Sequence, residues 1–144
     1  MENAMNDQAG LHRERFTLEV WQDGICQVKP HVSLTPALIE EIARAALRLI
    51  QDRRGVRGIV LDVREHSPLS IVRLSNLVDR LGEMGLPLVV LFSETRYQRV
   101  ATLLHNTLAH RERVAYATDP AQARALIKSA TNDSSSHPTG HLYR

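Results

Sequence analysis

The sequence predicts a single-domain α/β protein: a mixed β-sheet layered with helices, in the order ββαβαβαβα. Near the N-terminus, two strand-like runs flank an Asp23-Gly24 turn. After them, helical stripes with 3–4 residue spacing alternate with short β-branched apolar runs. The 144 residues, 43% of them hydrophobic, are enough for one core. Because strands that alternate with helices pair in parallel through right-handed crossovers, we expect a largely parallel sheet with one antiparallel strand.

The first two strands form a hairpin. Residues 16–21 alternate apolar and polar side chains, which is typical of a half-buried strand. Asp23-Gly24 is a common hairpin turn, and residues 25–28 form the return strand. We expect Trp21 at the rim of the core and Cys26 packed as a small hydrophobe.

Each predicted helix begins with a capping side chain. Thr35, Ser67 and Asp119 each precede a proline at the first helical position, and Ser93 caps the helix after the strand at 88–92. The side chains expected to face the core are Leu38, Ile39, Ile42, Ala46, Leu49 and Ile50; then Ile71, Leu74, Leu77, Val78, Leu81 and Met84; then Tyr97, Val100, Ala101, Leu104 and Leu108; and finally Ala121, Ala125 and Leu126, with Ile127 as a further candidate.

Three further runs, at residues 56–63, 88–92 and 113–117, are expected to be buried strands. Residues 1–12 lack periodicity and are expected to form a flexible N-terminal tail. The domain then covers residues 13–130. Residues 131–144 are rich in Ser, Thr, Asn, Pro and Gly and are expected to be a disordered C-terminal tail.

Composition and charge argue against several classes of protein. The longest apolar stretch, residues 86–92, is far shorter than a membrane helix, and the polar N-terminus does not resemble a secretory signal. We therefore expect a cytoplasmic protein. The net charge is only +2, its arginines are interleaved with acids, and aromatic residues make up 4%, which disfavours nucleic-acid binding.

Motifs for cofactor, metal and catalytic chemistry are missing from the sequence. There is no glycine-rich phosphate loop and no G-x-S-x-G elbow. His105 and His110 are five residues apart and do not share a helical face, and no other spacing is typical of a zinc site. We expect no cofactor, no metal and no enzymatic activity.

Three segments resemble the STAS domain, the fold of bacterial anti-sigma-factor antagonists. The run 58–63 is similar to the family's central strand, which ends in an Asp-Leu or Asp-Val pair. Residues 82–92 resemble its passage from a helix through glycine to a strand, and residues 113–126 resemble its last strand and Ala-rich closing helix. The resemblance covers about residues 14–129, is closest to a divergent branch of short bacterial proteins, and implies a non-enzymatic regulatory or interaction domain.

The family's phosphorylated motif is an Asp-Ser-Ser/Thr-Gly turn before the helix that follows the central strand. Here the corresponding stretch is Arg64-Glu65-His66-Ser67-Pro68-Leu69-Ser70, with serines nearby but neither the preceding Asp nor the following Gly. A phosphate on Ser67 or Ser70 would add about −2 charge at a helix N-terminus. The simpler interpretation, which we favour, is that Ser67 only caps the helix.

Two groups of residues are candidates for a functional site, because ligands bind at the carboxyl ends of parallel strands. The first group, for interaction or phosphorylation, consists of Asp62, Arg64, His66, Ser67 and Ser70. The second, for an anion or other ligand, consists of Ser93, Thr95, Arg96 and Arg99. The alternatives are structural: Asp62 pairing with a nearby arginine, and a capped helix with a solvated basic face.

The leading hypothesis is a regulatory or protein-interaction module that binds a partner protein through residues 64–70. The alternative is a carrier or sensor for an anionic or apolar metabolite. The opening strand could also pair with a second copy to give a homodimer.

Overall fold

The computed structural model describes residues 15–66, 70–109 and 111–136. It contains the predicted order of elements, ββαβαβαβα, with one short 3-10 turn at Arg111–Arg113 before the last strand. The elements are β1 (Phe16–Val20), β2 (Ile25–Pro30), α2 (Pro36–Asp52), β3 (Gly58–Asp62), α3 (Ile71–Gly82), β4 (Leu88–Leu91), α4 (Glu94–Thr107), β5 (Val114–Ala117) and α5 (Pro120–Ser136).

The five strands form one mixed sheet in the order β1-β2-β3-β4-β5. β1 and β2 are antiparallel, with Val20 opposite Cys26, and each later pair is parallel. The carboxyl ends of β3, β4 and β5 therefore lie at the same edge of the sheet. Both the antiparallel hairpin and the three parallel crossovers agree with the sequence-based prediction.

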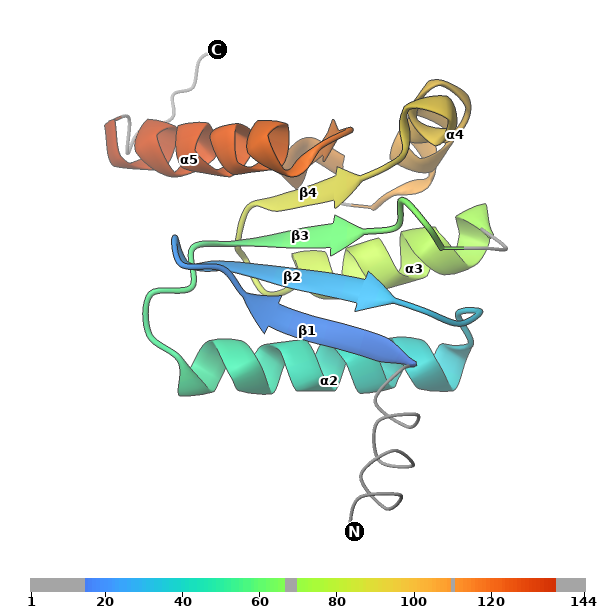
Figure 1. Cartoon of the computed structure of the whole chain (residues 1–144), viewed down its shortest axis with the longest axis horizontal. Coiled ribbons are helices and arrows are strands. Elements are labelled where there is room, and N and C mark those ends of the chain that lie inside the picture. The colour runs from blue at the N-terminus through green and yellow to red at the C-terminus, as the bar shows by residue number, and fades with distance from the viewer. Residues whose placement is uncertain (1–14, 67–69, 110, 137–144) are drawn as a thin grey trace, which may run out of the picture.

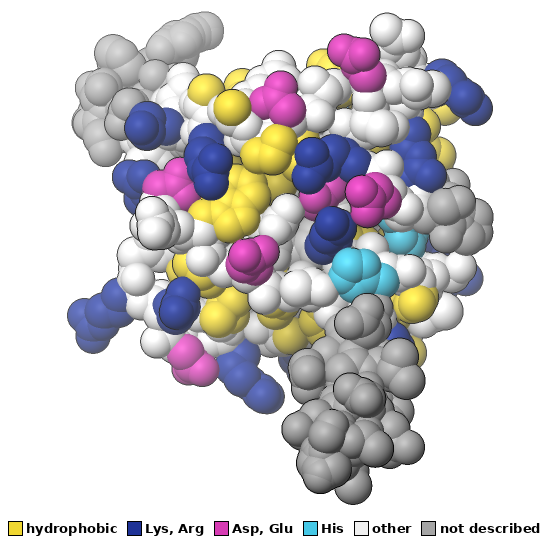
Figure 2. Space-filling model, viewed as in Figure 1, with side chains coloured by type: hydrophobic (Ala, Val, Ile, Leu, Met, Phe, Trp, Pro, Cys, Tyr) yellow, Lys and Arg dark blue, Asp and Glu magenta, His cyan; other side chains and the backbone are white. Residues whose placement is uncertain are grey.

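Helices cover the two faces of the sheet unequally (Figure 1). α2, α3 and α4 pack on one face, where they bury alternate strand residues such as Val28, Leu61 and Val90. Of the described helices, α5 is the one that packs on the other face, over Val60 and Val89. This second face is turned toward the viewer in Figure 2, where charged side chains surround hydrophobic ones.

α5 approaches β3 closely because the first residue of that strand is glycine. A Cβ atom built on Gly58 would lie 2.6 Å from Cγ2 of Ile127, which is itself 2% exposed. Cys26 is fully buried as expected, and burial raises the pKa of its thiol to about 11. None of the helices in the described ranges is long and apolar enough to cross a membrane.

The start of α3 differs from the prediction. Its N-cap is Ser70, whose Oγ accepts a hydrogen bond from the backbone N–H of Arg73 at 3.3 Å, and the helix begins at Ile71. Ser67 and the proline after it, predicted to start the helix, lie outside the described residues. Ser67 and Ser70 are nearly one helical turn apart, so a helix that begins after either serine would bury almost the same face. The apolar stripe could not distinguish them.

Two buried faces were also assigned incorrectly. In the described part of α5, Ile127 is buried and Leu126 is half-buried, in agreement with the prediction, but Ala121 and Ala125 are exposed and Ala123 is buried instead. An alanine-rich helix offers little contrast between its faces, so the stripe was ambiguous. Tyr97 was expected to face the core but is 38% exposed, because the start of α4 lies beside an open cavity near the edge strand β5.

The C-terminal boundary of the domain was placed at residue 130. In the structure α5 continues to Ser136, so the last helix reaches past that boundary into the segment that was expected to be a disordered tail.

Candidate functional site

Asp62 ends β3 and is held by four hydrogen bonds. Its Oδ1 accepts from the backbone N–H of Arg64 at 3.0 Å and from Arg64 Nε at 3.1 Å. Its Oδ2 accepts from Arg64 Nη2 at 2.9 Å and from Gln27 Nε2 at 3.1 Å. The Asp62 side chain is fully buried, and the hydrogen bond with Asp62 raises the pKa of Arg64. Asp62 therefore pairs with a nearby arginine, as in the structural alternative of the sequence analysis, and this pair fixes the beginning of the loop that follows β3.

Gln27 was missed by the sequence analysis although it completes this network. It lies in β2, beside β3, and its Oε1 accepts a weak hydrogen bond from Trp21 Nε1 at 3.4 Å. The available signal was a polar residue between the buried Cys26 and Val28. Strand alternation alone predicts that such a residue faces solvent. Only the β2–β3 register, which pairs Gln27 with Val60, brings its side chain within reach of Asp62, two residues further along β3.

His66 is buried rather than available at the surface. Its side chain is 3% exposed, and its Nδ1 has no hydrogen-bond partner among the described residues. Burial lowers the pKa of the imidazole, a hydrogen bond with the Pro30 carbonyl opposes that shift, and the nearby Arg96 and His31 lower the pKa further. The imidazole thus connects the β3–α3 loop with the end of β2.

The lowered pKa of His66 predicts a pH-dependent stability. Below the ordinary value of 6.5, the unfolded chain protonates this histidine more readily than the folded chain does. The contribution of His66 to the free energy of unfolding should therefore be complete above pH 6.5 and should be lost as the pH falls below that value. Urea denaturation at several pH values measures this, and a His66→Asn variant should show a flatter dependence. An unchanged pH dependence in that variant would contradict the assignment.

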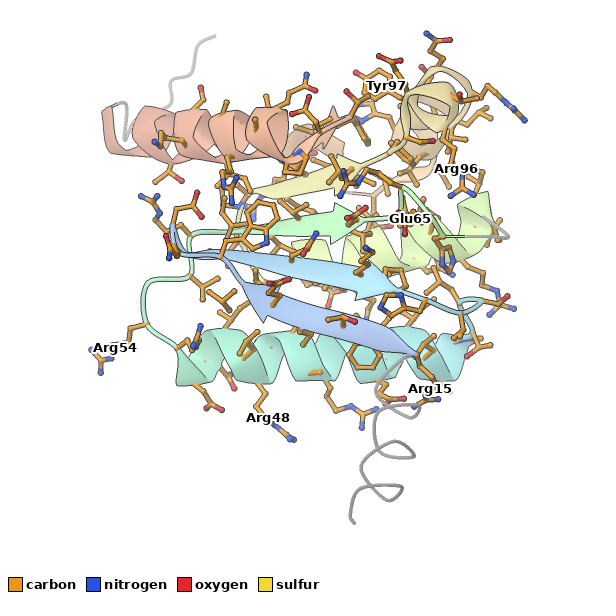
Figure 3. The ribbon with its side chains drawn as sticks, viewed as in Figure 1. Arg15, Arg48, Arg54, Glu65, Arg96 and Tyr97 are labelled. Carbon is orange, nitrogen blue, oxygen red and sulfur yellow. The ribbon has the colours of Figure 1, made fainter. Side chains whose placement is uncertain are left out.

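The second candidate group gathers around the start of α4. Ser93 caps this helix through a hydrogen bond from the Arg96 backbone N–H at 3.4 Å. Arg96 Nη1 donates to the Val63 carbonyl at 2.9 Å, so this side chain ties α4 to the loop after β3 (Figure 3). Ser93, Thr95, Arg96 and Arg99 line one open cavity of about 640 Å³, together with Ile71, Val100 and Leu103.

The two predicted groups are therefore neighbours. Ile71, the first residue of α3, lines the same cavity as Arg96 and Arg99, and it directly follows the exposed Ser70. In residues 15–66, 70–109 and 111–136, no group of three or more His, Cys, Asp or Glu side chains could hold a metal ion. The arrangement therefore combines three features: a loop whose start is held by hydrogen bonds, the exposed Ser70 at the N-terminus of α3, and two arginines, Arg96 and Arg99, that line a cavity together with apolar side chains.

Comparisons with known proteins give a match at the level of structure. No protein-family model matches the chain, and no curated protein matches it. A solved structure of a serine-to-glutamate variant of RsbS from Moorella thermoacetica superposes with a TM-score of 0.60 and 20% sequence identity, covering 82% of this chain and 98% of that one. A chain of the stressosome superposes with a TM-score of 0.58 and 18% identity, covering 80% of this chain and 98% of that one.

Both superpositions extend over nearly the full length of the solved chains, and the order of elements and the parallel crossovers of this protein are those that the sequence predicted. The chain therefore has a STAS-like α/β fold, a five-stranded mixed sheet layered with helices.

Proposed function

We propose that the protein is a non-enzymatic regulatory module that binds a partner protein through the β3–α3 loop and the first turn of α3. The observation that carries this proposal is the exposure of Val72, which is 64% exposed only two residues after the N-cap Ser70. A valine side chain this exposed buries little apolar area within the single chain, so covering it with a partner would remove additional apolar area from water.

The surroundings of Val72 support this assignment. Glu65 is 84% exposed, and Ser70 is exposed at the N-terminus of α3. Hydrogen bonds from Arg64 to Asp62 and from Arg96 to the Val63 carbonyl fix the start of the loop, so this part of a docking surface would need little ordering on binding. The stressosome, which has a similar fold, is described as a hub for signal integration and transduction, and this suits a regulatory role.

Changing Val72 to aspartate should abolish partner binding without unfolding the protein. We expect recovery of the partner in quantitative pull-down to decrease at least about tenfold, corresponding to about 1.4 kcal/mol. Leu47→Asp is the matched control, because Leu47 is an exposed leucine, 41% exposed, on α2. Equal recovery with both variants would place the docking surface elsewhere.

Ser70 tests whether the surface responds to charge. Ser70→Asp places a negative charge at the N-terminus of α3, whereas Ser70→Ala removes the capping hydroxyl without adding charge. If the surface is switched by phosphorylation, the set of partners recovered from lysate should change with Ser70→Asp and not with Ser70→Ala. The same experiment with Ser67→Asp covers the other predicted serine. If both aspartate variants recover the same partners as the unmodified chain, a phosphate switch is contradicted.

One observation favours a second candidate function, a sensor or carrier of an anionic metabolite. The four residues predicted for an anion site line a single cavity beside the apolar Ile71 and Leu103. Native mass spectrometry of the purified full chain should then show a retained anion that is lost in an Arg99→Glu variant. Consistently empty spectra would count against this function.

A homodimer by strand addition is a further part of the proposal. β1 is an edge strand of the sheet, so one of its sides lies beside no other strand in the described residues. Light scattering of the full chain measures the oligomeric state directly.

A further inference from the structure

Two turns meet at the end of the sheet opposite the β3–α3 loop. One is the hairpin turn at Asp23 and Gly24, and the other, residues 53–57, connects α2 with β3. The backbone N–H of Arg57 donates to the Gly24 carbonyl at 2.8 Å, and Arg57 Nε donates to the Asp23 carbonyl at 3.2 Å. A Cβ atom on Gly24 would lie only 2.3 Å from the Gly55 carbonyl oxygen, so the turns are in direct contact.

These turns enclose an open cavity of about 750 Å³, lined by residues 20–24 and 53–57. Three arginines, Arg53, Arg54 and Arg57, belong to its lining. A fourth, Arg124 of α5, stands nearby, with its guanidinium 4.4 Å from the centre of the Trp21 ring. Segments that are far apart in the sequence thus bring four arginines to one end of the fold.

Acidic side chains at this end offset only part of the positive charge. Asp23 Oδ2 accepts from Arg124 Nε at 3.1 Å, and the ion pairs found within the described ranges include none with Arg53, Arg54 or Arg57. A cation at the C-terminus of α2 would be favoured by the helix dipole, which accounts for the C-cap Arg53. The dipole does not account for Arg54 and Arg57, which lie beyond the helix.

We propose that this cavity binds a small molecule that carries two adjacent phosphate groups. The planar guanidinium fork matches the oxygens of a phosphate, and phosphate carries more charge per group than a carboxylate. Three arginines and one carboxylate, that of Asp23, line the cavity, and this positive excess favours a ligand with more than one anionic group. The cavity also lies within the size range of small-molecule sites and is much larger than a single ion needs.

The site is separate from the proposed partner surface. Arg57 immediately precedes the first residue of β3, whereas Asp62 and the β3–α3 loop are at the other end of that strand. Failure of one proposal therefore leaves the other standing. Figure 3 shows Arg54 on the turn beyond α2, with its side chain extending outward from the fold, while Arg48 projects from the outer side of α2.

Trp21 provides a direct readout, because it is the one tryptophan in the chain and it lines the cavity. Titration of the full chain with inorganic pyrophosphate should give a saturable change in tryptophan fluorescence that weakens with added salt. In an Arg53→Gln/Arg54→Gln variant the affinity should decrease at least about tenfold. Arg57 is left intact because its side chain holds the two turns together.

The matched control is Arg44→Gln/Arg48→Gln, which removes the same charge from two exposed positions of α2 outside the cavity. It should retain nearly the affinity of the unmodified chain, and circular dichroism should show that both variants are folded. The proposal would be overturned by the absence of saturation, or by an equal loss of affinity in both variants. Binding to a single-stranded oligonucleotide or to anionic lipid vesicles, without binding to pyrophosphate, would also overturn it.

Discussion

Replacing Arg64 with alanine should destabilise the protein by about 3 kcal/mol, because it leaves the Asp62 carboxylate buried without its countercharge. The Asp62 side chain is 0% exposed, and two of its hydrogen bonds come from the guanidinium that would be lost. The Gln27 amide and one backbone N–H would remain as partners. Urea denaturation of the variant and the unmodified chain measures the difference in free energy of unfolding.

Arg80→Ala is a matched control for this experiment. The side chains of Arg64 and Arg80 are 34% and 35% exposed, and both arginines form a two-pronged contact with one carboxylate. The partner of Arg80, Glu40, is 48% exposed and can be solvated by water after the change, so a much smaller loss is expected. Adding Asp62→Asn to Arg64→Ala should restore part of the lost stability. Similar losses for Arg64→Ala and Arg80→Ala would show that burial of the carboxylate is not the cause.

The Arg64 variant also bears on function. Asp62 and Arg64 hold the start of the loop whose far end leads into Ser70 and the exposed Val72. Partner recovery should therefore decrease with Arg64→Ala even at a temperature where the variant remains folded, because the loop would need ordering on binding.

Replacing Gly24 with alanine should cost about 3 kcal/mol or more, since two unfavourable effects act together. Gly24 has a φ of 85°, in the region that residues with a side chain rarely adopt. Its new methyl group would also lie 2.3 Å from the Gly55 carbonyl oxygen, which is backbone and cannot move away without separating the two turns. The free energy of unfolding from urea denaturation measures the effect.

Gly55→Ala separates these two effects. Gly55 has a similar φ of 89°, but a Cβ atom built on it would meet nothing within 4 Å. We expect a loss of about 1 kcal/mol from backbone strain alone. The difference between the variants then reports the contact between the turns, and equal losses would argue against that contact.

The order and type of the elements could be predicted from the sequence because their signals are local. Alternation over residues 16–21 and the apolar stripe of α2 repeat within two to four positions, and capping by Thr35 and Ser93 acts within one turn. Where the local signal was degenerate, the prediction was wrong. The prediction began α3 at Ser67, whereas its N-cap is Ser70, nearly one turn later. In the alanine-rich α5, the buried and exposed sides differ too little in composition to be distinguished from the sequence.

The sequence by itself located the carboxyl ends of β3 and β4 to within one residue, since the apolar runs end at Val63 and Phe92 and the strands end at Asp62 and Leu91. Only the tertiary structure decided what those residues contact. The hydrogen bonds of Gln27 with Asp62, of Arg96 with Val63, and of Arg57 with Gly24 join segments that are more than thirty residues apart. Such contacts depend on strand register and on the faces to which the crossovers carry the helices, and no periodic pattern within one segment records either.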